Sequence, residues 1–129
     1  MRTKAFTLIA IAFLCMSASL YASKDYTKEY AMFDLDQIVV NPLGGGMSMF
    51  SAMVSLEYKQ SDKNLPTELK NKKRVIEDRV GFYFSSKTVE ELRKFENRET
   101  FKDEIMNTIN GLLREGRITE ISFSRFNIM

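Results

Sequence analysis

Apolar and polar residues alternate with a period of two along residues 47–60. Such alternation predicts a half-buried β-strand that keeps its apolar side chains on one face. At about 3.3 Å per residue this strand would be roughly 45 Å long, so we expect it to bend or to overhang its sheet. The apolar positions are Phe50, Ala52, Val54, Leu56 and Tyr58.

The opposite face of this strand carries three methionines, Met47, Met49 and Met53. Methionine side chains are flexible and polarizable, so they suit either the underside of covering helices or contact with a partner protein. We expect these three to pack against helices, and contact with a partner is the alternative.

A shorter strand precedes the long one, over residues 33–40, and Asn41-Pro42 ends it. The run Gly44–Gly46 then predicts a flexible turn. A phosphate-binding Walker loop would continue with Gly-Lys-Ser or Gly-Lys-Thr and open a helix. A methionine and a serine follow here instead, so the glycines predict a hairpin turn between two strands.

Two segments after the long strand show the spacing of amphipathic helices. The first is expected to begin at Pro66-Thr67. The second is divided into two helices by a break near Glu96-Asn97 and is expected to end at Gly116. The apolar positions are Leu69, Ile76, Val80 and Tyr83 or Phe84 in the first helix, then Phe101, Ile105, Ile109 and Leu112 in the last.

The stretch from Ser85 to Thr88, Ser-Ser-Lys-Thr, lies between these helical segments. Thr88 is followed three residues later by Glu91, which predicts a capping box at a helix start, while Ser85 and Ser86 end the previous helix. A catalytic Ser–Lys pair would need a buried, neutral lysine. Lys87 is expected in solvent beside the cap, so the stretch predicts a turn rather than a nucleophile with its base.

Residues 117–129 close the chain as a strand whose apolar residues change phase near Ser124-Arg125. A β-bulge there would bring both apolar pairs onto one face. The elements then follow the order β-β-α-α-α-β, so the predicted fold class is α+β, an antiparallel sheet with helices packed on it. The two apolar pairs are Ile121 with Phe123 and Phe126 with Ile128.

The N-terminal residues have the layout of an export signal, because Arg2 and Lys4 precede an apolar stretch and small residues follow from Ser17. Read through to Ala22, the stretch is also just long enough to span a bilayer. We predict an uncleaved signal anchor over residues 1–23, and a cleaved signal peptide is the alternative. The membrane segment would include Phe6, Leu8, Ile9, Ile11, Phe13 and Leu14.

Either interpretation exports the remainder, a juxtamembrane linker over residues 24–31 and a periplasmic domain over residues 32–129. Two of the 19 basic residues, Arg2 and Lys4, precede Lys24 and no acidic residue does, so the exported part has 17 basic and 17 acidic residues. A net charge of zero does not suggest a nucleic-acid partner.

The residue types present limit the chemistry of the chain. It has no histidine and no tryptophan, and Cys15 is its only cysteine. Without histidine the commonest general base and the commonest metal ligand are missing. A lone cysteine excludes an internal disulfide. The composition thus argues against the usual general base and the usual metal ligands. Together with the family resemblance given below, it leads us to expect no catalytic residue, no cofactor, no metal and no small-molecule substrate.

Two stretches resemble the family of the flagellar basal body-associated protein FliL. Residues 85–113, "SSKTVEELRKFENRETFKDEIMNTINGLL", and residues 118–129, "ITEISFSRFNIM", are similar to the family's C-terminal pattern. That pattern is a Ser-Ser-Lys-Thr turn, Glu-Glu-Leu, a helix containing an Ile-Asn pair, and a closing strand. Residues 32–58, "MFDLDQIVVNPLGGGMSMFSAMVSLEY", resemble the family's start, where an asparagine ends the first strand.

The resemblance implies a non-enzymatic motor accessory with a stomatin/prohibitin-like periplasmic domain. Proteins similar to this one are single-pass proteins of the bacterial inner membrane, held beside the flagellar stator channel formed by MotA and MotB. They are thought to form a homo-oligomeric ring that supports torque. The expected partners are therefore MotA/MotB, further copies of the chain, and the inner membrane. The expected oligomer interface comprises Gly44, Gly45, Gly46, Met47 and Met49.

Two other classes of function compete with this interpretation. A soluble periplasmic adaptor would result if the signal were cleaved, and detergent-dependent extraction separates it from an anchored protein. A hydrolase with a Ser–Lys pair is the third class, and the missing histidine and the predicted helix cap argue against it.

Overall fold

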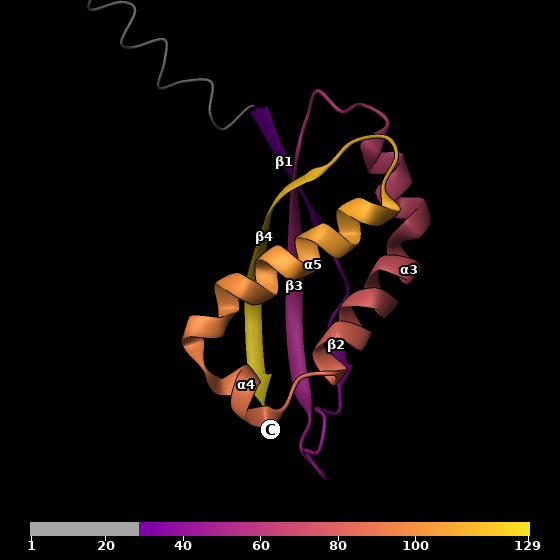
Figure 1. Ribbon diagram of the computed structural model, residues 1–129. Coiled ribbons are helices and arrows are strands. Elements are labelled where there is room, and N and C mark those ends of the chain that lie inside the picture. The colour runs from indigo at the N-terminus through magenta and orange to yellow at the C-terminus, as the bar shows by residue number, and fades with distance from the viewer. Residues whose placement is uncertain (1–28) are drawn as a thin grey trace, which may run out of the picture. The chain divides into compact units, whose positions relative to one another are not determined.

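The computed structural model describes residues 29–129, of which Ala31–Met129 form one compact unit. The predicted anchor and most of the predicted linker lie outside the described residues. The class is α+β, as predicted from the sequence (Figure 1). In chain order the elements are β1 (Tyr30–Asp34), β2 (Ile38–Val40), β3 (Phe50–Lys59), α3 (Leu65–Ser85), α4 (Val89–Arg93), the 3-10 helix η1 (Phe95–Asn97), α5 (Arg98–Leu112) and β4 (Ile118–Ile128).

Strand β3 is the centre of the sheet, with β4 along one side and both β1 and β2 along the other. The predicted first strand is therefore two strands, interrupted at residues 35–37, and both pair with β3. The expected long strand is shorter, Phe50–Lys59 instead of residues 47–60. Of the two expectations for it, a bend or an overhang, the overhang is wrong, since β4 pairs with β3 from Phe50 to Tyr58. Within residues 29–129 the outer strands of the sheet are β1, β2 and β4.

The apolar face of β3 forms one side of the hydrophobic core, as predicted. Phe50, Ala52, Val54 and Leu56 are completely buried or nearly so. Helices α3 and α5 lie across this face of the sheet (Figure 1). They bury apolar residues at helical spacing, which is the usual way an amphipathic helix covers a sheet. These residues are Leu65, Leu69, Ile76, Val80 and Phe84 from α3, and Phe101, Ile105 and Ile109 from α5.

The predicted β-bulge in the last strand is present. Met53 pairs with Arg125, but the next residue of β3, Val54, pairs with Phe123, so Ser124 is the extra residue. One extra residue reverses the alternation of side chains along β4. As a result Phe123 and Phe126 both face the helices.

Helix α5 ends at Leu112, earlier than the predicted stop at Gly116. Leu113 already has an extended backbone, with φ −91° and ψ 144°. Two side chains described below, Asn110 and Glu68, hold the loop that follows. A glycine in a sequence marks where a helix can stop, whereas tertiary hydrogen bonds decide here where it does stop.

The two ends of β3 gather different parts of the chain. Asp34 and Leu35 lie beside Ser55 and Val54, so β1 begins toward the Lys59 end of β3. The β3–α3 turn and the α5–β4 loop lie at that same end. The other end of β3 carries the glycine turn, the turn between α3 and α4, and the C-terminus (Figure 1).

Candidate functional site

The Ser-Ser-Lys-Thr stretch is a turn held by its own side chains. The hydroxyls of Ser85 and Ser86 donate to the carbonyls of Phe82 and Tyr83, at 2.8 and 2.6 Å. Thr88 Oγ1 accepts the N–H of Glu91, and the Glu91 carboxylate accepts the N–H of Thr88, so the capping box is formed. Both serine hydroxyls bond to the backbone, which is the geometry of a helix end rather than of an activated nucleophile.

Lys87 is not in solvent as the sequence suggested. Its side chain is only 23% exposed, and its ammonium lies 4.9 Å from the centre of the Tyr83 ring and 5.8 Å from that of Phe101. Burial and a hydrogen bond to Glu104 raise the pKa of the Tyr83 hydroxyl. The lysine therefore packs on aromatic rings beside a carboxylate, an arrangement that holds the turn against α5.

The glycine turn lies directly beside this helix turn, so the structure brings two stretches predicted separately to one place. Leu43 N–H donates to the carbonyl of Lys87 at 2.9 Å. Gly44 and Gly46 have positive φ angles of 64° and 60°, which favour glycine. A side chain at Gly45 would meet Val89 at 3.3 Å. The glycines thus serve a tight turn against the start of α4.

The methionines after this turn are exposed, so the expectation that helices cover them was wrong. Met47 is 98% exposed and Met49 is 36% exposed. Met49 exchanges two backbone hydrogen bonds with Met129, at 2.9 and 2.8 Å, and Met129 is also largely exposed. The exposed apolar surface at this end of the sheet, here called the distal apolar surface, comprises Leu43, Met47, Met49 and Met129.

The face of the sheet away from α3 and α5 continues this surface. Val39 pairs with Ser51 and therefore points away from the helices, and it is exposed. Met53 lies two residues beyond Ser51 on the same face and is half-buried. The side chain of Asp34 lies on this face, because it accepts a hydrogen bond from Ser55. Met32 lies two residues before Asp34 in the same strand, so it shares this face, and it is exposed. Alternation in the sequence placed Met53 on this face, but it did not assign Val39 or Met32 to it and did not tell that the helices would leave it open.

Sequence reasoning missed a second group of exposed residues on the helical side. Phe82 of α3 and Phe95 of η1 are 75% and 77% exposed. Arg98 follows Phe95 closely, and its guanidinium stacks on that ring. Phe82 and Phe95 stand outside the helical repeat of buried positions, and that is the signal that could have marked them as surface residues.

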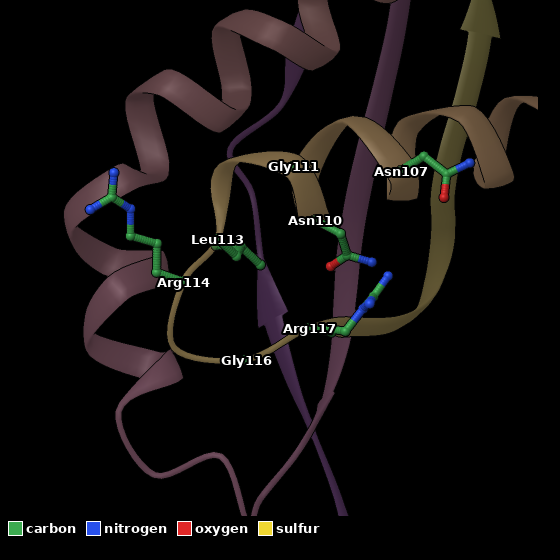
Figure 2. A pocket seen from close by; sticks show the side chains of 7 residues that line it. All are labelled: Asn107, Asn110, Gly111, Leu113, Arg114, Gly116 and Arg117. Carbon is green, nitrogen blue, oxygen red and sulfur yellow. The ribbon is translucent and has the colours of Figure 1, made fainter.

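The loop between α5 and β4 borders a shallow cavity of about 470 Å³ (Figure 2). In Figure 2 the Asn110 side chain points toward the start of β4, whereas the Arg114 side chain points away, toward α3. Asn110 accepts the N–H of Ile118 at 2.7 Å and donates to its carbonyl at 3.1 Å. The asparagine of the Ile-Asn pair therefore fixes the first residue of the last strand.

Glu68 of α3 fixes the same loop from the other side. Its carboxylate accepts the N–H groups of Arg114 and Glu115 at 2.9 Å, and Lys72 donates to it at 2.9 Å. Lys72 also donates to the carbonyl of Leu112, at the end of α5. Burial alone would raise the pKa of Glu68, but the hydrogen bonds from Glu115, Lys72 and Arg114 outweigh it and hold the pKa below its ordinary value. Together with the Asn110 contact, these hydrogen bonds tie α3, the end of α5 and the start of β4 to one another. The loop beside the cavity therefore has a structural role.

Residues 29–129 contain neither a cluster of metal ligands nor a helix that could span a membrane. No group of three or more histidine, cysteine, aspartate or glutamate side chains there is arranged to hold a metal ion. Within the same residues, no helix combines the length and apolar character that crossing a membrane requires. The predicted membrane residues from Phe6 to Leu14 lie outside that range and stay a prediction.

Comparison with known proteins identifies the family of the chain. Residues 32–128 match the family described as "Flagellar basal body-associated protein FliL". The chain is 31% identical over 97 residues to the "Flagellar protein FliL" of Aquifex aeolicus, covering 75% of this chain and 60% of that protein. It is 32% identical over 94 residues to the protein of the same name from Borreliella burgdorferi, covering 73% and 51%.

A third relative, the "Flagellar protein FliL" of Treponema pallidum, is 34% identical over 77 residues, covering 59% of this chain and 42% of that protein. The chain thus spans about half the length of the curated relatives it matches. The family match includes every element from β2 to β4, together with the helix turn and the Asn110 contact described above. The chain belongs to the FliL family of flagellar basal body-associated proteins.

Proposed function

We propose that this chain is a non-enzymatic accessory of the flagellar motor that associates with the MotA/MotB stator and supports torque as a homo-oligomeric ring. Membership of a basal body-associated family supports the motor context. The observation that carries the binding role is the distal apolar surface, where Met47 is almost completely exposed. Exposed apolar side chains that gather at one end of a sheet are typical of a site that contacts other proteins.

The shape of this surface suits contact between copies of the chain. The glycine turn is compact and lies at the end of the central strand, where a neighbouring subunit can approach the backbone closely. Methionines adapt to a neighbour of slightly different orientation, which a ring of variable curvature requires. Because the exported residues carry no net charge, self-association would depend on shape and apolar contact rather than on long-range attraction.

We propose further that residues 1–23 anchor the chain in the inner membrane by a single pass, with residues 32–129 in the periplasm. The order of basic, apolar and small residues supports this topology. A stomatin/prohibitin-like architecture of the domain is part of the same proposal. An anchor would hold copies at high local concentration, so that weak contacts suffice for assembly.

A second candidate function is that of a soluble periplasmic adaptor, released when the signal is cleaved. The small residues Ser17, Ser19 and Ala22 favour it, because they occupy the positions that precede such a cut. Mass spectrometry of the N-terminus of the native protein separates the two candidates. An intact N-terminus and detergent-dependent extraction support the anchor, whereas a chain beginning near Leu20 or Ser23 supports the adaptor.

A localisation experiment tests the stator association itself. A fluorescent fusion of the full chain should form foci at flagellar bases in cells that have the stator and become dispersed in cells that lack MotA and MotB. Deletion of the gene should reduce the torque measured from a bead attached to a filament. Foci that persist without the stator, or unchanged torque after deletion, would contradict the proposal.

A further inference from the structure

Arg98, at the start of α5, is clamped between two aromatic rings. Its guanidinium carbon lies 4.5 Å from the centre of the Phe126 ring and 5.0 Å from that of the Phe95 ring. The first ring comes from the last strand and the second from η1. The clamp fixes the plane of a side chain that is otherwise among the most flexible in a protein.

The hydrogen bonds of Arg98 are incomplete within residues 29–129. Its Nε is buried and has no hydrogen-bond partner among them. Two neighbouring cations differ in this respect, since Lys102 pairs with Glu99 and Lys87 lies 3.9 Å from Glu104. A buried donor without an acceptor is costly and is rare in native proteins. Stacking on the two rings offsets part of this cost, but the buried Nε still lacks an acceptor among these residues.

The outer ring of the clamp also lacks a structural explanation. Phe95 is 77% exposed, although a phenylalanine side chain gains free energy from burial. Aromatic residues and arginine are both enriched in the cores of protein–protein interfaces, and here an exposed phenylalanine lies beside an oriented arginine. The guanidinium can form two parallel hydrogen bonds to a carboxylate, and a partner that covered Phe95 would shield them from water.

We propose that Arg98 and Phe95 form an anchor for an acidic side chain, aspartate or glutamate, on another protein of the motor. The inference rests on the proposed function, because it names the chemistry by which the chain would hold a motor partner. Phe126, which supports the clamp, faces the helices, whereas Met49 and Met53 face the other side of the sheet. One side of the domain would thus serve self-assembly and the other the partner.

The composition of the clamp suits a carboxylate on a protein surface. One guanidinium lies beside an apolar ring, so it offers paired hydrogen bonds to a single carboxylate while the ring contacts apolar groups of the same partner. Phe126 pairs with Ala52, near the end of β3 that carries the glycine turn, whereas β1 begins toward the opposite end. Within the domain the clamp therefore lies nearer to the glycine turn than to the start of β1.

Suppressor genetics with the full-length chain tests the proposal. Arg98→Glu should reduce swimming to the level of the deletion strain, because two carboxylates would then face each other. Arg98→Lys should be intermediate, since an ammonium cannot form the paired hydrogen bonds. Arg93→Glu is the matched control, because Arg93 is an exposed arginine that no ring holds, and it should swim normally. Melting of the purified variants in detergent should stay within a few degrees of the parent.

The suppressors of Arg98→Glu decide what the anchor binds. Changes of aspartate or glutamate to lysine in another motor protein support the proposal. Changes of acidic residues within this chain would show that the clamp contacts another copy of the chain. Changes at Phe95 or Phe126 alone would show that the clamp has a structural role. Either of these two results overturns the proposal. If deletion of the gene leaves swimming intact, the proposed function fails. If deletion impairs swimming but Arg98→Glu does not, only the anchor fails.

Discussion

Phe123 and Phe126 lie three residues apart in one strand, yet their rings are 5.4 Å apart on the same side of the sheet. In a regular strand, residues separated by three positions face opposite sides. Ser124 makes the difference, because it is the extra residue of the β-bulge in β4. Both rings reach Phe84 of α3, so the bulge contributes directly to the core.

Deletion of Ser124 should therefore be tolerated. Without it, the residues from Ile121 to Ile128 alternate regularly, and all four apolar side chains still face the helices. We expect the melting temperature of the deletion variant to stay within a few degrees of the parent. Deletion of Ser122 is the control. It would turn Phe123 away from the helices unless the bulge moved, and we expect a loss of about 3 kcal/mol or more, the usual cost of removing a buried phenylalanine.

Much of this fold could be predicted from the sequence because its signals are local. The alternation around Val54, the phase change at Ser124 and the cap at Thr88 each depend on neighbours within a few residues. The surroundings of Lys87 could not be predicted, because they depend on Phe101 and Glu104 from another helix.

The open face of the sheet escaped prediction for a different reason. A strand such as β3, with methionines on its second face, is compatible with helices on one side or on both. Only the folded arrangement shows that α3 and α5 share one side. Arg98 was missed because its two rings come from β4 and η1 and meet it only in the folded chain.

Substitution of the distal apolar surface should separate assembly from folding. Met47→Glu and Met49→Glu place charges on exposed positions, so we expect circular dichroism and melting of the variants to remain close to those of the parent. Assembly, measured by crosslinking in membranes, and swimming should be lost. Val75→Glu, on an exposed position of α3, is the control and should assemble normally. Normal assembly of both methionine variants would place the interface elsewhere.

Loss of the Asn110 contact should loosen the start of the last strand. Asn110→Ala leaves two backbone groups of Ile118 without their partner, which we expect to cost about 1–3 kcal/mol. Hydrogen exchange at the amide of Ile118 should accelerate. Asn107→Ala is the matched control, because Asn107 is exposed on the same helix (Figure 2). Equal exchange in both variants would show that the contact does not hold the strand.

The helix cap at Thr88 is expected to contribute about 1 kcal/mol to stability. Thr88→Ala removes the oxygen that accepts the N–H of Glu91, whereas Thr88→Ser retains it. Chemical denaturation should therefore show a lower midpoint for the alanine variant and nearly the parental midpoint for the serine variant. Equal losses in the two variants would point to the methyl group of threonine rather than to the cap.

Stability should fall on acidification partly through Glu68. Its pKa in the folded chain is below the ordinary value, so folding favours the charged form. This contribution is complete above the unfolded pKa of about 4.3 and is lost as the pH falls through the lower folded pKa. Glu68→Gln should flatten the dependence of melting temperature on pH in that acidic range. An unchanged dependence in Glu68→Gln would show that this carboxylate does not contribute.

The position of β1 beside β3 has a mechanical consequence. The strand begins toward the Lys59 end of β3, while the distal apolar surface lies at the opposite end. Tension applied between the first residue of β1 and that surface would act along the strands. Hydrogen bonds between strands are perpendicular to the strand direction, so such a pull would load them together in shear instead of opening them one by one. We therefore expect the domain to resist a force applied along its strands without separation of β1 from β3.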